Sequence, residues 1–356
     1  MQLNRYPAPK TDHLVRLTDD TGMIQHAAYS LPDRDSGYAT DDNARALVVA
    51  LALEEAGIQG VTPLIEVYMA YLKHSQLADG RFHNLMDYSR RFVDDVGSED
   101  CLGRCLWASG RATMSQNPAI RLNGERLFNG ALPWCERLKA PRARAQAILG
   151  LRFRLLSLGS GEGLEATMIK GIMKVLADSL VTQKEWYSQP QWQWYEDILA
   201  YDNGLLPASL FAAYREIKDD RYLGCGQETL AFLTGQTWRG RHFKTVGNRG
   251  WYKKGYTMAE YDEQPVDMGT LVLACGEAYH ATGEERYYRL AHMAFQWFLG
   301  RNSAGKALYD ERTGGCHDGI TPEGVNLNMG AESVLAFFIA YLSLLECAKK
   351  RHHVAA

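Results

Sequence analysis

Residues 38–53, YATDDNARALVVALAL, place two adjacent aspartates and an asparagine at the start of a long apolar segment. Apolar residues recur in this segment at helical spacing, so it predicts a helix that begins near residue 41. Carboxylates in a first helical turn interact favourably with the helix dipole, and Thr40 is a candidate N-cap. The same acids would also suit an active site at the mouth of the helix. We expect Asp41 to serve the helix and Asp42 to face a cleft.

The same helical period covers most of the 356 residues, whereas alternating strand patterns are scarce. Gly and Asn turns separate the helical segments, as in EEAGIQG at residues 54–60. Together with the N-terminal segment, the pattern predicts about twelve helices. Eleven of them are expected at residues 41–56, 61–76, 99–114, 119–138, 141–158, 165–182, 202–217, 220–234, 267–282, 284–299 and 331–349.

One pattern recurs six times along the chain: a polar cluster, then a small residue, then an amphipathic helix. Successive copies start about 40 to 65 residues apart. A second helix or a returning loop follows each copy, which predicts six antiparallel hairpins. We expect an all-α (α/α)6 toroid that forms a single domain over residues 1–356. An open solenoid is the alternative, but the last copy lacks a polar capping face. Small residues that would let the inner helices approach closely are Ala44, Ala46, Gly103, Ala145, Ala208, Gly269 and Ala331.

Composition and charge narrow the function further. The chain is 46% hydrophobic and 23% charged, with a net charge of -3, which gives no basis for binding nucleic acid or an anionic membrane. Neither a signal peptide nor an apolar run of membrane-spanning length is evident. Seven scattered cysteines argue against a disulfide framework, and no second pair joins Cys101 and Cys105 at zinc-site spacing. We therefore expect a cytoplasmic protein without a metal or cofactor.

In such a toroid, the residues that precede each inner helix lie at one end of the barrel. Four long loops, at residues 76–97, 188–204, 245–267 and 301–330, arrive at the same end. Lengthened loops on one face of a rigid scaffold commonly carry the functional site. The polar residues at these helix mouths are Asp41, Asp42, Asn43, Glu99, Asp100, Arg142, Arg144, Asp202, Asn203, Asp267 and Glu332.

Aromatic and acidic residues occur together in those loops, which suits sugar chemistry. The chain has 19 Tyr and 8 Trp, and aromatic rings beside carboxylates can stack on sugar rings while the acids bind hydroxyls. Glycoside hydrolysis uses two carboxyl groups, about 6.5–9.5 Å apart in inverting enzymes, and the acid needs a raised pKa. The loop residues concerned are Trp192, Trp194, Tyr195, Glu196, Asp197, Trp251, Tyr256, Tyr261 and Glu263.

Each of these residues also has a purely structural interpretation. Capping accounts equally well for Asp41 after Thr40 and for Glu99 after Ser98. A core position is the commoner role of any single tryptophan, and a structural role is the commoner one for His83 and His317. Other enzyme classes fit less well, since the chain has no G-x-S-x-G, Walker A, G-x-G-x-x-G or H-E-x-x-H motif.

Five segments carry a resemblance to the six-hairpin glycosidase-like superfamily. They are GYATDDNARAL, GSEDCLGRCLWASG, WQWYEDILAYDNGLLPASL, EQPVDMGTLVLAC and TGGCHDGITPEGVNLNMGAES, and they span about residues 30–345. The superfamily includes glucoamylase-like hydrolases, unsaturated glucuronyl hydrolases and N-acylglucosamine 2-epimerases. Within it, the chain is most similar to a bacterial group of glycosidase-like proteins associated with glycosyltransferases. The resemblance implies an (α/α)6 barrel with a carbohydrate cleft at the helix mouths, and inversion if the protein hydrolyses.

These observations favour an inverting glycoside hydrolase acting on an oligosaccharide. We expect Glu196 to be the general acid, because Trp192, Trp194 and Tyr195 precede it and would raise its pKa. Asp42 or Asp100 is the expected base. Trp194, Trp251 and Tyr261 would stack on rings. The other expected substrate contacts are Asp41, Asn43, Glu99, Asp197, Asp202, Asn203, Glu263, Asp267, His317 and Glu332.

Three alternatives remain open. A sugar epimerase or isomerase would need a base such as His83 or His317 beside a carbon acid. A phosphorylase could bind phosphate through Arg142 and Arg144. A non-catalytic glycan-binding partner of a glycosyltransferase would bind sugar without turnover.

Overall fold

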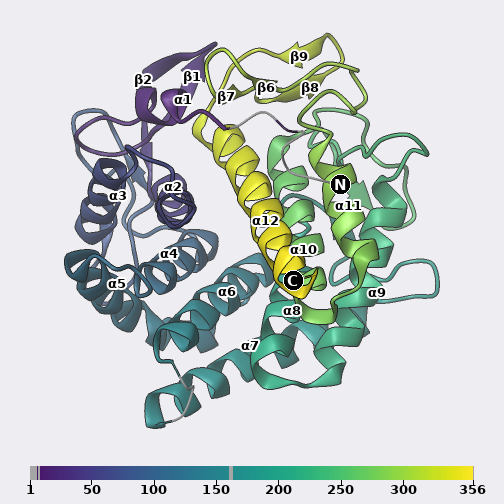
Figure 1. Cartoon of the computed structure of the whole chain (residues 1–356), viewed down its shortest axis with the longest axis horizontal. Helices are drawn as coiled ribbons and strands as arrows, with labels where there is room; N and C mark the ends of the chain where they lie inside the picture. The colour runs from purple at the N-terminus through teal and green to yellow at the C-terminus, as the bar shows by residue number, and fades with distance from the viewer. Residues whose placement is uncertain (1–5, 7–8, 160–162, 356) are drawn as a thin grey trace.

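The computed structural model describes residue 6, residues 9–159 and residues 163–355, with side chains up to residue 351. Six inner helices form a closed ring, in which each packs on the next and the last packs on the first (Figure 1). The inner helices are α2 (Thr40–Glu55), α4 (Glu99–Ala112), α6 (Pro141–Ser157), α8 (Leu205–Ile217), α10 (Pro265–Thr282) and α12 (Ala331–Ala355).

Outer helices lie around this ring, each joined to an inner helix as an antiparallel hairpin. They are α3 (Thr62–Ser75), α5 (Pro118–Ala131), α7 (Leu164–Tyr187), α9 (Asp220–Thr237) and α11 (Glu285–Phe295). The short α1 (Asp12–Arg16) contacts α12. The predicted (α/α)6 barrel is therefore confirmed, with most helix ends within a few residues of the expected positions. One segment differs, because Pro133 converts the end of the predicted 119–138 helix into a 3-10 helix, η2 (Leu132–Arg137).

Short antiparallel strands stand at the N-terminal ends of the inner helices (Figure 1). β1 (Ile24–Ala28), β2 (Leu31–Ala39) and β3 (Leu85–Met86) form one sheet, and β2 leads directly into α2. The remaining strands form three pairs, β4 (Ile198–Leu199) with β5 (Tyr252–Lys253), β6 (Tyr309–Asp310) with β7 (Gly315–Cys316), and β8 (Gly319–Thr321) with β9 (Gly324–Asn326). These short strands, which the helical periodicity did not indicate, shape the end of the barrel where the long loops gather.

Close contacts between inner helices depend on small residues, as expected from the sequence. A Cβ added to Gly103 would lie 2.8 Å from the Ala143 carbonyl oxygen, and one added to Gly269 would lie 2.8 Å from that of Ala336. Real Cβ atoms do not approach backbone oxygens this closely, so a larger residue at either position would push the helices apart.

Helix α12 combines great length with an apolar sequence. Among the described residues, it is the one helix long and apolar enough to cross a membrane, with a mean hydropathy of 1.6 over Ala331–Arg351. In the structure 72% of that window is buried, because α12 packs against α10 and α2. This burial is that of a core helix of the barrel.

Candidate active site

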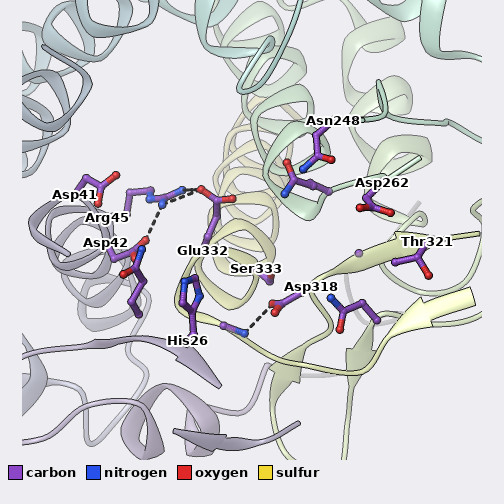
Figure 2. Close-up of a pocket in the computed structure, with 15 residues that line it drawn as sticks. His26, Asp41, Asp42, Arg45, Asn248, Asp262, Asp318, Thr321, Glu332 and Ser333 are labelled. Atoms are coloured by element: carbon purple, nitrogen blue, oxygen red, sulfur yellow. Dashed lines mark hydrogen bonds and ion pairs between the residues drawn. The ribbon is translucent and has the colours of Figure 1, made fainter. Parts of the chain in front are cut away.

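A cavity of about 340 Å³ opens at the N-terminal ends of α2 and α12. The walls come from α2, α12, β1, the β8–β9 hairpin and the loop that precedes α10 (Figure 2). Two of the four long loops predicted at this end, 245–267 and 301–330, therefore line it. The lining residues are Gln25, His26, Asp41, Asp42, Arg45, Asn248, Asp262, Gln264, Asp318, Gly319, Thr321, Asn326, Gly330, Glu332 and Ser333.

Arg45 organises the carboxylates on the α2 side of the cavity. Its guanidinium donates to Asp42 Oδ1 at 2.6 Å and to Glu332 Oε2 at 3.0 Å, and so connects α2 to α12. Asp42 Oδ2 has no hydrogen-bond partner among the described residues, and Glu332 keeps 43% of its side chain exposed. One oxygen of each carboxyl is thus oriented by Arg45 while the other is left for the cavity.

The surroundings of Asp42 change its acidity. Burial raises the pKa of Asp42 to about 7, and the nearby Asp41 and Glu332 carboxylates act in the same direction. The ion pair with Arg45 opposes the shift without cancelling it. Asp42 is therefore a carboxyl group that can hold a proton near neutral pH, which is the property that general-acid catalysis requires.

A second arginine lies below the cavity and ties α4 to α2 and to the loop that precedes α8. Arg104 of α4 donates to Asp41 Oδ2 at 2.6 Å and to Asp202 Oδ2 at 3.0 Å. Asp202 is buried beneath the cavity, whereas 20% of the Asp41 side chain is exposed. Asp41 makes no helix-cap hydrogen bond, since the N-cap position is Ala39 and it has no side-chain cap. The expected capping roles of Asp41 and Thr40 are therefore wrong.

Acidic residues also line the opposite wall of the cavity, from the loops rather than from α2 (Figure 2). Asp318 Oδ1 accepts a hydrogen bond from the Gly330 amide at 2.7 Å, at the start of α12. Burial raises the pKa of Asp318, although the Gly330 amide and His26 oppose the shift. Asp262 Oδ2 accepts from Arg249 Nε at 3.1 Å. Carboxyl groups thus stand on both sides of one cavity, with Glu332 between them.

The residues expected around Glu196 form a separate cluster. Arg142 donates to Glu196 Oε2 at 2.7 Å and contacts the Tyr201 carbonyl oxygen, while the Tyr201 hydroxyl donates to Asp100 Oδ2. Neither Glu196 nor Asp100 lines the cavity. The structure therefore separates both from Asp42, and the ion pair with Arg142 gives Glu196 an environment opposite to the apolar one expected for a general acid.

Three tryptophan-loop residues were expected beside the substrate, but the structure places them in the core. Trp194 and Tyr195 are 0% exposed and Trp192 is 4% exposed, and both indoles pack on Phe232. A ring without accessible faces cannot stack on a sugar, so the predicted role of Trp194 is wrong. Trp192 also donates its indole N–H to the Glu196 backbone carbonyl at 2.7 Å, which fixes the shape of this loop.

Several polar residues at the helix mouths hold the scaffold rather than the cavity. Asn43 bonds to Met23 and Ala39, and Glu99 accepts from the Lys139 and Ala140 amides ahead of α6. Others complete hydrogen bonds in buried positions, so their expected substrate contacts are corrected. These are Asn203 with Asp267, and Glu263 with Thr245 and Trp297. Arg144, which a phosphorylase could have used to bind phosphate, is partly buried and donates to the Leu138 carbonyl oxygen and to Gln183.

The remaining predicted residues lie around the rim of this end, outside the cavity lining. Asp197 is exposed and pairs with Lys254 at 3.0 Å. The rings of Trp251 and Tyr261 are partly buried, against Tyr201 and under Lys244 respectively. The side chains of His83 and His317 bond to the carbonyl oxygens of Asp94 and Leu327.

Several residues that complete the cavity were not predicted from the sequence. Asp318 directly follows His317 within one of the resemblance segments, and the amide of Gly330 that orients it was in the same segment. His26 lies in the β1–β2 hairpin, where the short alternation of residues 24–39 was the available signal. Arg45 stands one helical turn after Asp41 and Asp42, on the face that the helical period assigns to them.

Two features bear on cofactors and redox chemistry. The described residues contain no group of three or more His, Cys, Asp or Glu side chains arranged to hold a metal ion. All seven cysteines are free and buried, including Cys101 and Cys105.

Comparison with known structures identifies the fold. No protein-family model matches the sequence, and neither does any curated protein. The chain superposes on D-mannose isomerase with a TM-score of 0.69 at 12% identity, covering 94% of this chain and 96% of the isomerase. The cellobiose 2-epimerase of Bacillus thermoamylovorans gives 0.71 at 10% identity, with the same coverage. A GH76 α-mannanase of Bacteroides thetaiotaomicron gives 0.64 at 11% identity, covering 97% and 96%. The chain has the six-hairpin glycosidase-like fold.

Proposed function

We propose that this protein is a carbohydrate-active enzyme, and specifically an inverting glycoside hydrolase that acts on an oligosaccharide. The observation that carries the proposal is the pair of acidic walls facing one cavity of about 340 Å³. That volume is at the lower end of the range for small-molecule sites. Inverting hydrolysis needs one carboxyl group on each side of the scissile bond, and these walls supply them.

Asp42 is the proposed general acid. Its raised pKa lets it carry a proton at neutral pH, and its Oδ2 has no partner among the described residues. Protonating the leaving-group oxygen is the step that such a group performs. This assignment replaces Glu196, whose carboxylate is held by Arg142 outside the cavity.

Asp318 is the proposed general base on the opposite wall. The Gly330 amide fixes one of its carboxyl oxygens at the N-terminus of α12, where the helix dipole favours the ionised form. The other oxygen can then orient a water molecule for attack on the anomeric carbon. Glu332, between the two walls, is suited to accept hydrogen bonds from sugar hydroxyls.

A mannanase of the same fold adds support from outside this chain. An inactive α-1,6-mannanase variant, in which two consecutive aspartates are replaced by alanine, was solved with an α-1,6-linked mannose oligosaccharide. Adjacent carboxyl groups therefore serve activity in at least one protein of this architecture. By analogy, we infer that Asp41 and Asp42 act together here, with Arg104 keeping Asp41 in place.

The test is an oligosaccharide panel, with and without phosphate, assayed for new reducing ends. Hydrolysis predicts reducing ends without phosphate, and NMR of the first product should show the inverted anomer. Asp42→Asn should abolish the reaction, while Asp197→Asn, a substitution of the same type on an exposed loop residue, should not. Full activity of Asp42→Asn on a cleaved substrate would refute the assignment.

A sugar epimerase or isomerase is the second candidate, because His26 lines the cavity. Such an enzyme exchanges the proton on a carbon next to the carbonyl, for which an imidazole is a suitable base. The isomerase and epimerase of the same fold give TM-scores of 0.69 and 0.71, against 0.64 for the mannanase. Products that have the mass of the substrate in H2O, and that gain deuterium at the exchanged carbon when the reaction is run in D2O, would establish this alternative. Saturable sugar binding without either reaction would instead indicate a glycan-binding protein.

A further inference from the structure

A second cavity, of about 230 Å³, lies at the opposite end of the barrel. All six inner helices contribute to it, so it stands on the barrel axis. Its inner wall is apolar and includes Val49, Leu149 and Ile339, while charged side chains surround its mouth. The proposed active site does not use any of these residues.

Ion pairs occupy every arginine at this mouth. Arg111 pairs with Glu55, and Arg215 pairs with Glu277 at 2.8 Å. Arg152 lies 3.2 Å from Glu216. An anionic ligand would therefore have to break an existing ion pair to reach a guanidinium.

One carboxylate at the mouth has no such partner. Glu346 of α12 makes no ion pair or hydrogen bond within the described part of the chain, although its side chain is exposed to the cavity. Lys350, one turn later, donates instead to the carbonyl oxygens of Tyr279 and His280 at 3.3 and 3.0 Å. Within the described residues, the three arginines and Lys350 balance the four glutamates in number, and Glu346 is the one carboxylate of this mouth that is outside an ion pair.

The surroundings of Glu346 favour a cation further. Five of the inner helices end around this mouth, and helix C-termini carry partial negative charge. His280 adds no positive charge at neutral pH, because burial lowers its pKa to about 4. Desolvation by the cavity walls raises the pKa of the Glu346 carboxyl; Glu277 and Glu55 act in the same direction, whereas Arg111 and Arg152 oppose the shift.

The rings of Phe153 and Trp107 form part of the cavity wall. Arg111 already covers the ring of Phe153, with its guanidinium carbon 4.8 Å from the ring centre. Trp107 also lines the cavity, but only 6% of the residue is exposed, so its ring contributes to the apolar wall rather than an open face for a cation.

We propose that this second cavity binds a small organic cation, namely an ammonium group on an apolar body. The ammonium group would pair with Glu346, and the apolar part would fill the space lined by Val49, Leu149 and Ile339, against Trp107. This site is independent of the function proposed for the first cavity, and neither proposal depends on the other.

Calorimetric titration of the intact protein tests this with three six-carbon probes that differ in charge. Hexylammonium should bind at one saturable site, and hexanoate should bind at least tenfold more weakly, with hexanol in between. Glu346→Gln should weaken hexylammonium binding at least tenfold. The matched control is Glu66→Gln, an exposed glutamate on α3 without an ion pair in the described chain, which should bind like the wild type.

Ala52→Leu provides a second variant that leaves the charges intact. Ala52 is a partly buried residue of the cavity wall, so a larger side chain there should occupy the space of the ligand. The affinity of this variant for hexylammonium should therefore also fall at least tenfold. The proposal is overturned if wild-type protein shows no saturable hexylammonium binding, or if hexanoate binds as tightly. Unchanged binding by either folded variant would overturn it as well.

Discussion

Asp41 and Asp42 are consecutive residues of α2, yet their carboxyl groups have different neighbours. Asp41 pairs with Arg104 of α4 and keeps 20% of its side chain exposed, whereas the Asp42 side chain is 5% exposed and shares Arg45 with Glu332. A helix turns by about 100° per residue, so adjacent side chains project into different surroundings. That difference is the reason why we propose Asp42, rather than Asp41, as the general acid.

The pH dependence of catalysis should follow the protonation of Asp42. Because its pKa is raised to about 7, the protonated form predominates below that pH and is lost above it. We expect kcat/KM to fall about tenfold per pH unit on the alkaline side of neutral pH. In Asp42→Asn, kcat should drop by about 10²–10⁴-fold with KM little changed. Wild-type activity that stays constant from pH 6 to pH 9 would contradict the role of Asp42.

Asp267 should make the stability of the protein depend on pH. Burial, with a contribution from Asp202, raises its pKa from 3.8 to about 8, so the folded protein retains a proton that the unfolded chain releases. This contribution to stability is complete below pH 4 and decreases as the pH rises to about 8. Relative to wild type, Asp267→Asn should gain in Tm between pH 5 and pH 8, because an amide does not titrate. Asp197→Asn is the control, and a constant Tm difference would contradict this account.

At the scale of elements, buried arginines hold the inner helices in register. Arg104 connects α4 to α2 and to the loop that precedes α8, and Arg45 connects α2 to α12. Both are buried, so the ion pairs that they form are little screened by water. The carboxylates on the α2 and α12 side of the cavity are therefore positioned by helix-to-helix contacts, whereas Asp318 and Asp262 are held within the loops.

Removing Arg104 should destabilise the barrel. Arg104→Ala leaves the buried Asp202 without its counterion, which costs about 3–5 kcal/mol in comparable cases. Arg221→Ala removes exposed pairs with Asp178 and Asp219, which water screens, and should therefore cost much less stability than Arg104→Ala. Urea denaturation measures both, and equal losses would show that burial does not set the strength of the Arg104 network.

The contact between α4 and α6 gives a second element-scale prediction. A Cβ at Gly110 would lie 2.2 Å from the Gly150 carbonyl oxygen. Gly110→Ala should therefore separate the helices and cost about 1–3 kcal/mol. Gly171→Ala, in the exposed α7 with no atom within 4 Å of the new Cβ, should instead gain up to about 1 kcal/mol. Thermal unfolding of the two variants would contradict the packing argument if both shifted Tm in the same direction.

At the scale of the whole molecule, the fold was predictable from the sequence to a greater extent than the site. Helical periodicity is a local property, and six recurrences of one pattern were enough to predict a closed barrel and the end where its loops gather. The cavity depends instead on how those loops return. Asp318, next to the β8–β9 hairpin, lines the active-site cavity. Glu196 lies in an equally acidic loop, but its carboxylate pairs with Arg142 outside the cavity. No local pattern distinguishes the two outcomes. Trp194 shows the same limit, since its flanking polar residues resemble a binding loop although its ring is buried.

The two cavities should behave independently. Asp42 and Ala52 are ten positions apart on α2, or about 15 Å along the helix. We expect Asp42→Asn to change the affinity for hexylammonium by less than twofold, because substitutions at that separation seldom couple. Calorimetry of the variant measures this, and a tenfold change would reveal communication along the axis.

The side chains packed between the two cavities restrict the route by which a ligand can reach the active-site cavity. The space in this layer is only about 10 Å³, and it is lined by Arg45, Arg104, Trp107 and Gln146 among others. Packed side chains therefore separate the two cavities, and no open channel connects them along the barrel axis. A sugar polymer cannot be threaded through the ring. A ligand that binds beside Asp42 therefore has to approach and leave from the end of the barrel where the long loops gather, and not along the barrel axis from below.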